Sequence, residues 1–311
     1  MKCALCPRMC KVDRSKGELG FCKETHVIRI ARASLHMWEE PCISGQSGSG
    51  TVFFSGCHLG CVYCQNRTIS SGKFGVPVSV HELSDIFLEL QNRNAENINL
   101  VTPTHFVPGI AEALTQAKLH GLSIPVVYNT GSYENVETLK MLDGLIDIYL
   151  PDLKYVSTEI SSKYSNAPDY FEKAAKAIKE MYRQVGPTVF SGTPETYTED
   201  NESIPLMKRG IIVRHLVLPG HTEDSKRVIE YLYKTYGDTI FISIMNQFTP
   251  LENVESYPEL NRKITEAEYN NVLSYAMDLG LENAFIQEGE TAKESFIPDF
   301  SNFDIHTFLR R

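Results

Sequence analysis

The chain has 311 residues, of which 42% are hydrophobic and 22% charged, and its formal net charge is −9. This composition excludes a disordered or fibrous chain, and the acidic balance argues against a broad nucleic-acid-binding face. The N-terminus lacks the apolar core of a secretion signal, and no apolar run approaches the ~18 residues of a spanning helix. We therefore expect a cytoplasmic protein with no membrane or nucleic-acid partner.

From residue 51 onward, a short apolar strand, a turn and an amphipathic helix alternate along the chain. Capping boxes at Ser79 and Thr265 mark the starts of two helices. The polar stretch 187–208 is predicted to be a loop. The predicted strands cover residues 51–54, 98–101, 124–128, 146–150, 211–218, 239–244 and 284–286. The predicted helices begin at 79, cover 110–117, 134–142, 171–185 and 229–236, and begin again at 265.

Apolar strands separated by amphipathic helices indicate parallel β–α–β units with right-handed crossovers. Six such units favour an α/β fold, a partial (β/α)6 TIM-like barrel over residues 46–311. Residues 1–45 do not follow the pattern and are predicted to form a cysteine-rich N-terminal extension. In parallel architectures of this kind, functional groups gather at the C-terminal ends of the strands.

Cysteine usage is confined to one end of the chain, because all eight cysteines lie within the first 64 residues. Disulfides are disfavoured in a reducing cytosol, so a one-sided cysteine cluster indicates metal or redox chemistry. The eight are Cys3, Cys6, Cys10, Cys22, Cys42, Cys57, Cys61 and Cys64.

The strongest motif is Cys57-x3-Cys61-x2-Cys64, which directly follows the first predicted strand. Three thiolates in one tight loop can hold three irons of a [4Fe–4S] cluster and leave the fourth iron open to a small molecule. Structural zinc requires four ligands, so it would need His58 or a distant cysteine as well. The spacing favours the cluster over zinc and over metal-free thiols.

Residues 51–67, TVFFSGCHLGCVYCQNR, resemble the radical S-adenosylmethionine (SAM) enzymes, and most of all the pyruvate formate-lyase activating enzyme group. The resemblance extends over about residues 1–290. It implies a partial barrel, a [4Fe–4S] cluster on the three cysteines, and reductive cleavage of SAM to a 5′-deoxyadenosyl radical. Tyr63 would then lie beside the adenine of SAM.

The resemblance also implies SAM-binding roles at the ends of later strands. Lys154 would meet the SAM carboxylate, and Arg214, inside an apolar strand, needs either a ligand or a structural carboxylate as its partner. The family's Gly-Gly-Glu run after the second strand is absent, and threonines stand there instead. The residues expected to bind SAM are Tyr63, Thr102, Thr104, Asn129, Asp152, Lys154, Arg214 and Asn246.

The N-terminal extension carries a second cysteine set, Cys3-x2-Cys6-x3-Cys10-x11-Cys22. Four closed thiolates suit structural zinc, and a second [4Fe–4S] cluster is also chemically allowed. A metal-free segment is the third alternative. Because so small a segment cannot bury its own core, we expect it to be stabilised by a bound group.

Three functions follow from this sequence. The first is a radical SAM oxidoreductase that installs a glycyl radical on a partner enzyme, with flavodoxin or ferredoxin as the electron donor. The second keeps the radical chemistry but acts on a small molecule or another peptide. The third is a non-catalytic metal-binding or electron-transfer protein.

Overall fold

The computed structural model describes residues 2–72, 74–191, 205–287, 298, 300 and 303–309. Its centre is a 10-stranded sheet with the order β10-β9-β8-β6-β5-β4-β2-β1-β3, and β7 pairs with β8. Most of the predicted loop 187–208 lies outside the described residues. The strands are β1 Ile28–His36, β2 Ser49–Phe54, β3 Val76–Val78, β4 Ile98–Val101, β5 Val126–Thr130, β6 Ile148–Pro151, β7 Val189–Phe190, β8 Met207–Leu216, β9 Phe241–Met245 and β10 Ala284–Ile286.

Strands β2, β4, β5, β6, β8, β9 and β10 run parallel, as the alternating pattern predicts. The sheet is not closed, since β3 and β10 stand at its two ends, so the fold is a partial barrel. Every residue of β2, β4, β5 and β6 is buried, which explains why these strands are continuous apolar runs without alternation.

The N-terminal part of the chain contributes a strand that the sequence analysis did not predict. Strand β1 pairs antiparallel with both β2 and β3 and extends the sheet beyond β2. The range 1–45, predicted to be an extension, therefore includes a strand of the main sheet. This strand escaped notice because its antiparallel pairing breaks the strand–helix alternation on which the prediction depended.

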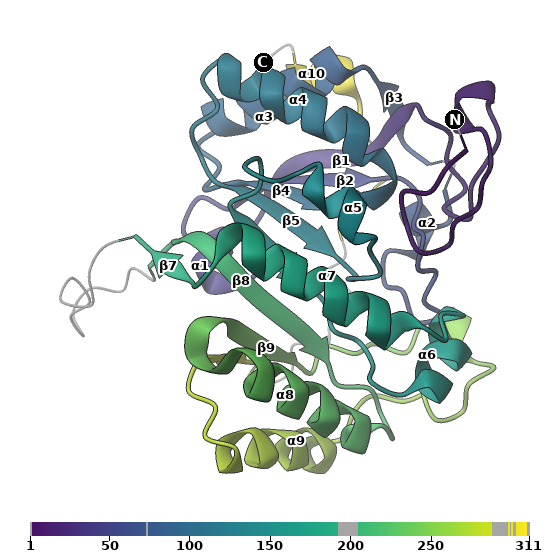
Figure 1. Ribbon diagram of the computed structural model, residues 1–311, viewed down its shortest axis with the longest axis vertical. Helices are drawn as coiled ribbons and strands as arrows, with labels where there is room; N and C mark the ends of the chain where they lie inside the picture. Colours follow the sequence, from purple (N-terminus) through teal and green to yellow (C-terminus); the bar gives the residue numbers. More distant parts are fainter. Residues whose placement is uncertain are drawn as a thin grey trace.

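The helices pack against the sheet and against one another. Figure 1 shows α3 beside α4 and α8 beside α9, and α7 lies against β6 and β8. The capping boxes at Ser79 and Thr265 start α3 and α9 as predicted. The α-helices are α1 Pro41–Ser44, α2 Arg67–Ser70, α3 Val80–Asn92, α4 Val107–Leu119, α5 Val136–Lys140, α6 Thr158–Ser165, α7 Tyr170–Val185, α8 Thr222–Tyr236, α9 Glu266–Asp278 and α10 Ile305–Leu309. None of the helices within the described residues is long and apolar enough to cross a membrane.

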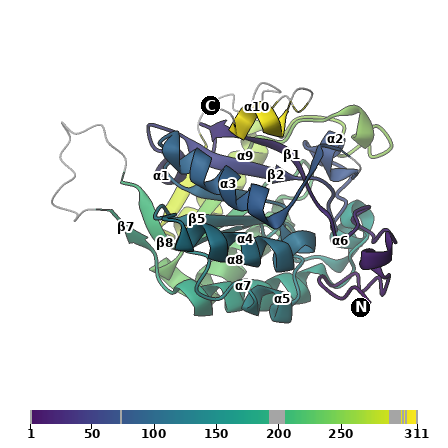
Figure 2. The same cartoon turned by 90° about the horizontal axis from the view of Figure 1, so that it is seen from above.

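The first part of the chain lies beside α6, far from it in sequence (Figure 2). The Arg8 side chain makes this contact, because its guanidinium donates to the carbonyls of Ser165 and Asn166 at the end of α6. The same guanidinium donates to the carbonyls of His58 and Leu59 in the loop after β2, at 2.9 Å each. The N-terminal segment thus packs directly onto the cysteine loop.

Candidate functional site

A cavity of about 260 Å³ opens at the C-terminal ends of the parallel strands. The loop after β2 forms one side of it, and the ends of β4, β5, β6, β8 and β9 form the other. This is the edge at which the sequence analysis expects the chemistry. Expected site residues that line the cavity are Cys57, Cys61, Tyr63, Cys64, Thr102, Asn129, Asp152, Lys154 and Arg214.

The three cysteines of the loop each have a hydrogen-bond donor aimed at their sulfur. The backbone N–H of Leu59 lies 3.4 Å from Cys57 Sγ, and the Ser165 hydroxyl donates to Cys61 Sγ at 3.1 Å. Cys64 Sγ accepts from the side chain of Ser70 and from the backbone of Asn66.

These donors fit thiolate ligands, because a neutral thiol is a weak acceptor, whereas hydrogen bonds to cluster sulfurs stabilise their negative charge. Burial raises the pKa of Cys57 to about 12, so this thiol stays protonated unless a metal displaces the proton. The donor set of the loop therefore matches the [4Fe–4S] cluster that the resemblance implies.

Glycines allow the loop to approach its neighbours closely. Gly56 and Gly60 have φ angles of 81° and 71°, in the left-handed region that favours glycine. A side chain at Gly56 would collide with the carbonyl of Cys22, and one at Gly60 would meet the ring of Phe21 at 3.4 Å. The loop is thus shaped by the N-terminal segment that covers it.

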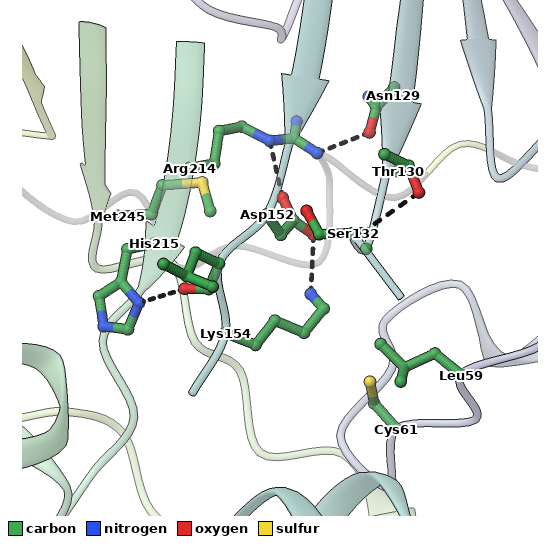
Figure 3. A network of polar contacts seen from close by, with 12 residues as sticks. Leu59, Cys61, Asn129, Thr130, Ser132, Asp152, Lys154, Arg214, His215 and Met245 are labelled. Carbon is green, nitrogen blue, oxygen red and sulfur yellow. Dashed lines mark hydrogen bonds and ion pairs between the residues drawn. The ribbon is translucent and has the colours of Figure 1, made fainter. Parts of the chain in front are cut away.

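Opposite the cysteine loop, a network of charged groups spans the ends of three strands (Figure 3). Arg214 Nε lies 2.9 Å from Asp152 Oδ1, and its Nη2 donates to Asn129 Oδ1 at 2.6 Å. Lys154 Nζ lies 2.7 Å from Asp152 Oδ2. Figure 3 shows the Lys154 ammonium on the side of Asp152 that faces Cys61 and Leu59.

Two opposing effects determine the protonation states in this network: burial disfavours the charged form of each group, and neighbouring opposite charges favour it. Burial disfavours the ionised form of Asp152, but Arg214 and Lys154 outweigh it and hold the pKa of Asp152 below its ordinary value. Burial opposes the charge of Lys154, but Asp152 and then Cys61 hold the pKa of Lys154 above its ordinary value. Both groups therefore stay charged at neutral pH, which suits a ligand that carries charges of both signs.

Glu39 is a site residue that sequence reasoning missed. It lines the cavity from the connection between β1 and α1, and its carboxylate lies 3.2 Å from Arg214 Nη1. Asn99 donates to its other oxygen at 3.0 Å. Burial raises the pKa of Glu39, and Arg214 opposes that shift. In the sequence, the only signal was a pair of acidic residues before a proline, which surface loops also show.

The two threonines after β4 have different surroundings. Thr102 lines the cavity with a φ of 57°, which is unusual for a β-branched residue, and its N–H donates to Asn129 O at 2.9 Å. Thr104 is fully buried and donates to Glu134 at 2.6 Å. Thr104 is not one of the residues that line the cavity, so the structure does not bring this expected SAM ligand to the site.

Asn246 is the other expected SAM ligand that does not line the cavity. Its backbone N–H donates to Gln287 Oε1 at 2.9 Å, so it connects the end of β9 to the end of β10. The neighbouring Gln247 lines the cavity instead. Neighbouring residues of a strand point to opposite sides of the sheet. Gln247 can therefore line the cavity while the adjacent Asn246 points away from it.

The N-terminal cysteines lie outside this cavity. All eight cysteines are free thiols. Among the described residues, no three Cys, His, Asp or Glu side chains surround a common point as the ligands of one metal ion do. The same holds for the loop Cys57–Cys64 and for the N-terminal cysteines. The structure thus gives no support to the zinc ion that was one of the alternatives for Cys3, Cys6, Cys10 and Cys22.

The profile of the radical SAM superfamily matches residues 51–204, a range that includes the cysteine loop, Asp152 and Lys154. An uncharacterized protein of Methanocaldococcus jannaschii is 28% identical over 292 residues, which are 90% of this chain and 75% of the relative.

Two solved structures of SuiB from Streptococcus suis share the fold. The one bound to S-adenosylmethionine is 13% identical with a TM-score of 0.51, and the match covers 80% of this chain and 52% of SuiB. The one bound to the precursor peptide SuiA is 13% identical with a TM-score of 0.50, over 80% and 51% of the two chains. The chain therefore spans about half the length of SuiB, and the likeness is one of fold.

Proposed function

We propose that the protein cleaves SAM reductively at a [4Fe–4S] cluster held by Cys57, Cys61 and Cys64, because the profile of the radical SAM superfamily matches residues 51–204, which include these cysteines. When bound, the cluster supplies the electron that breaks the sulfonium to methionine and a 5′-deoxyadenosyl radical. The observation that carries the proposal is the facing arrangement of three donor-assisted thiols and a charged network across one cavity.

The residues of this chain would bind and orient SAM. Lys154 offers a cation to the SAM carboxylate, and Asp152 holds that cation in place through its 2.7 Å contact. Asp152 supplies negative charge for the ammonium and sulfonium groups, and Glu39 adds a second carboxyl group, since Arg214 contacts both side chains. Tyr63, whose hydroxyl is 2.6 Å from that of Tyr155, forms an aromatic wall for the adenine.

The finer proposal concerns the target of the radical. We propose hydrogen abstraction from a glycine of a partner enzyme, with flavodoxin or ferredoxin as electron donor. In support, Trp38 lines the cavity and is 63% exposed, and a large exposed aromatic side chain beside a cavity suits docking of a polypeptide. Co-expression with a glycyl-radical enzyme of the same genome should give a glycyl EPR signal that Cys61→Ala abolishes; a small-molecule target gives no such signal.

The test of SAM cleavage is direct. The protein, reconstituted anaerobically with iron and sulfide and reduced with dithionite, should produce 5′-deoxyadenosine from SAM. Cys61→Ala should abolish the product, and Lys154→Met should raise the KM for SAM about tenfold or more, because a charged contact of about 1.5–3 kcal/mol is lost. Cys42→Ala, at a buried thiol outside the cavity, is the control. Full cluster content without any 5′-deoxyadenosine would contradict the proposal.

A further inference from the structure

Four thiols gather in the N-terminal segment, outside the site described above. The sulfurs of Cys22 and Cys10 lie 3.3 and 3.7 Å from the point where a Cβ on Gly20 would stand. Cys6 interacts electrostatically with Cys10 and Cys22, and Cys22 with Cys3 and Cys10. The fold thus brings residues 3 and 22 of the chain into one group of thiols, and glycine at position 20 leaves room for two of them.

Backbone donors point at these sulfurs just as they do around Cys57–Cys64. The N–H of Phe21 donates to Cys10 Sγ at 3.2 Å. The backbone of Arg8 donates to Cys6, and that of Glu24 donates to Cys22. Because neutral thiols accept hydrogen bonds weakly, three such donors indicate sulfurs that carry negative charge when the site is filled.

The N-terminal segment, residues 2–27, has little regular secondary structure to stabilise it. Residues 2–27 contain one short 3-10 helix, Arg14–Lys16, and no strand within this described range. A segment of this size without regular structure or a core of its own is normally stabilised by disulfides or a metal group, and its cysteines are free thiols. A group bound by the four thiolates would supply that stabilisation.

The spacing and arrangement favour an iron–sulfur cluster over a single ion. Cys3, Cys6 and Cys10 fall within eight residues, as Cys57, Cys61 and Cys64 do, with the two spacings in reversed order. Neither set of described thiols forms a group that could hold a single metal ion. The ligands of one zinc ion lie close together around it, whereas the thiolates of a cubane each bind a different iron and lie farther apart around the cluster.

We propose that Cys3, Cys6, Cys10 and Cys22 bind a second [4Fe–4S] cluster, closed by its four protein ligands. The segment rests on the loop of the first thiol set, with the Phe21 ring against Gly60 and the Cys22 carbonyl against Gly56. A closed cluster has no open iron for a substrate, so this one serves electron transfer and holds the segment on the cysteine loop. The proposal does not depend on SAM cleavage.

The experiment counts iron, sulfide and zinc per chain after anaerobic reconstitution. Wild type should bind about eight irons, and a triple Cys57→Ala, Cys61→Ala, Cys64→Ala variant should keep about four, with the EPR signal of a reduced [4Fe–4S] cluster. Cys10→Ala should lose about half of the iron while the far-UV circular dichroism spectrum and the remaining cluster persist. Cys42→Ala, the buried thiol outside both sets, should match wild type.

The outcomes separate this proposal from the proposed function. A triple variant without iron, or with one zinc per chain in its place, overturns the second cluster whatever the first site does. If wild type and the triple variant both hold about four irons, the second cluster stands and the role of Cys57–Cys64 fails. If Cys10→Ala loses all of its iron, the measurement is repeated with Cys3→Ala, at another partly exposed thiol. An iron content equal to that of wild type in Cys3→Ala counts against the proposal.

Discussion

At the scale of single residues, the site depends on hydroxyl groups that the motif does not contain. Ser165, at the end of α6, donates to Cys61 Sγ, and the hydroxyl of Tyr155 lies 2.9 Å from Ser165 Oγ. The Tyr63 hydroxyl continues the line at 2.6 Å from Tyr155. A row of buried hydroxyls thus runs from the wall of the cavity to the sulfur of Cys61, a proposed cluster ligand.

If Cys57, Cys61 and Cys64 hold the proposed cluster, removal of the Ser165 hydroxyl should change the reduction potential of that cluster. A hydrogen bond to a ligand sulfur stabilises the reduced, more negative state, so Ser165→Ala should lower the potential. We expect a shift of about 60 mV, which is a tenfold change in a one-electron equilibrium. Redox titration followed by EPR measures it.

Ser162→Ala is the matched control, because Ser162 lies on the same helix and donates to the Thr158 carbonyl rather than to sulfur. A Ser165→Ala protein with full iron content and the wild-type potential would refute this role for the hydroxyl.

At the scale of secondary-structure elements, Glu134 ties the ends of two neighbouring strands together. It accepts hydrogen bonds from Thr104, after β4, and from Thr130, the last residue of β5. Its carboxyl group is buried, and burial raises its pKa to about 7 despite the hydrogen bonds from the threonines and from Tyr128. The folded protein therefore favours the protonated form of Glu134.

The raised pKa predicts a pH-dependent stability. A carboxyl whose folded pKa of about 7 exceeds its ordinary 4.5 contributes fully below pH 4.5 and loses that contribution as the pH rises through 7. We expect wild type to lose about 3 kcal/mol relative to Glu134→Gln between these limits, from 1.36 kcal/mol per pKa unit. Urea unfolding of both proteins at pH 5 and pH 8 tests this.

Glu137→Gln is the comparison, since Glu137 lies in the first turn of α5 with an exposed side chain and its substitution leaves the buried carboxyl intact. If the stability difference between wild type and Glu134→Gln is the same at pH 5 and pH 8, the carboxyl does not titrate in this window.

At the scale of the whole molecule, Arg8 joins three parts of the chain that are distant in sequence. Its guanidinium donates to carbonyls of the cysteine loop and of the end of α6. Its Cζ atom also lies over the rings of Phe21 and Tyr133, 4.0 and 5.1 Å from their centres. One planar, permanently charged group can serve all these acceptors at once, which an ammonium cannot.

Loss of this side chain should release the N-terminal segment. Arg8→Ala should lower the stability by about 3 kcal/mol, because several charge-assisted hydrogen bonds to partly buried carbonyls are lost. Thermal unfolding and limited proteolysis within residues 1–27 are the measurements. Arg8→Lys should recover only part of the loss, and full recovery by lysine would show that charge alone holds the segment.

Much of the architecture could be predicted from the sequence because its causes are local. Apolar runs such as Ile98–Val101 and capping boxes such as that at Ser79 act within a few residues, and the structure has the strand and the helix where they predict them. The Cys57-x3-Cys61-x2-Cys64 spacing is likewise local, so the motif and its place after a strand were visible without the fold.

What only the tertiary structure decided are the partners of each side chain. Glu39 reaches Arg214 across the sheet, Ser165 reaches Cys61, and Thr104 turns from the cavity to Glu134. These contacts join residues separated by between 30 and 175 positions in the chain. No local pattern encodes such distances. They arise when the packed sheet brings the ends of its strands together. Charge and burial then determine which side chains form hydrogen bonds and ion pairs with one another.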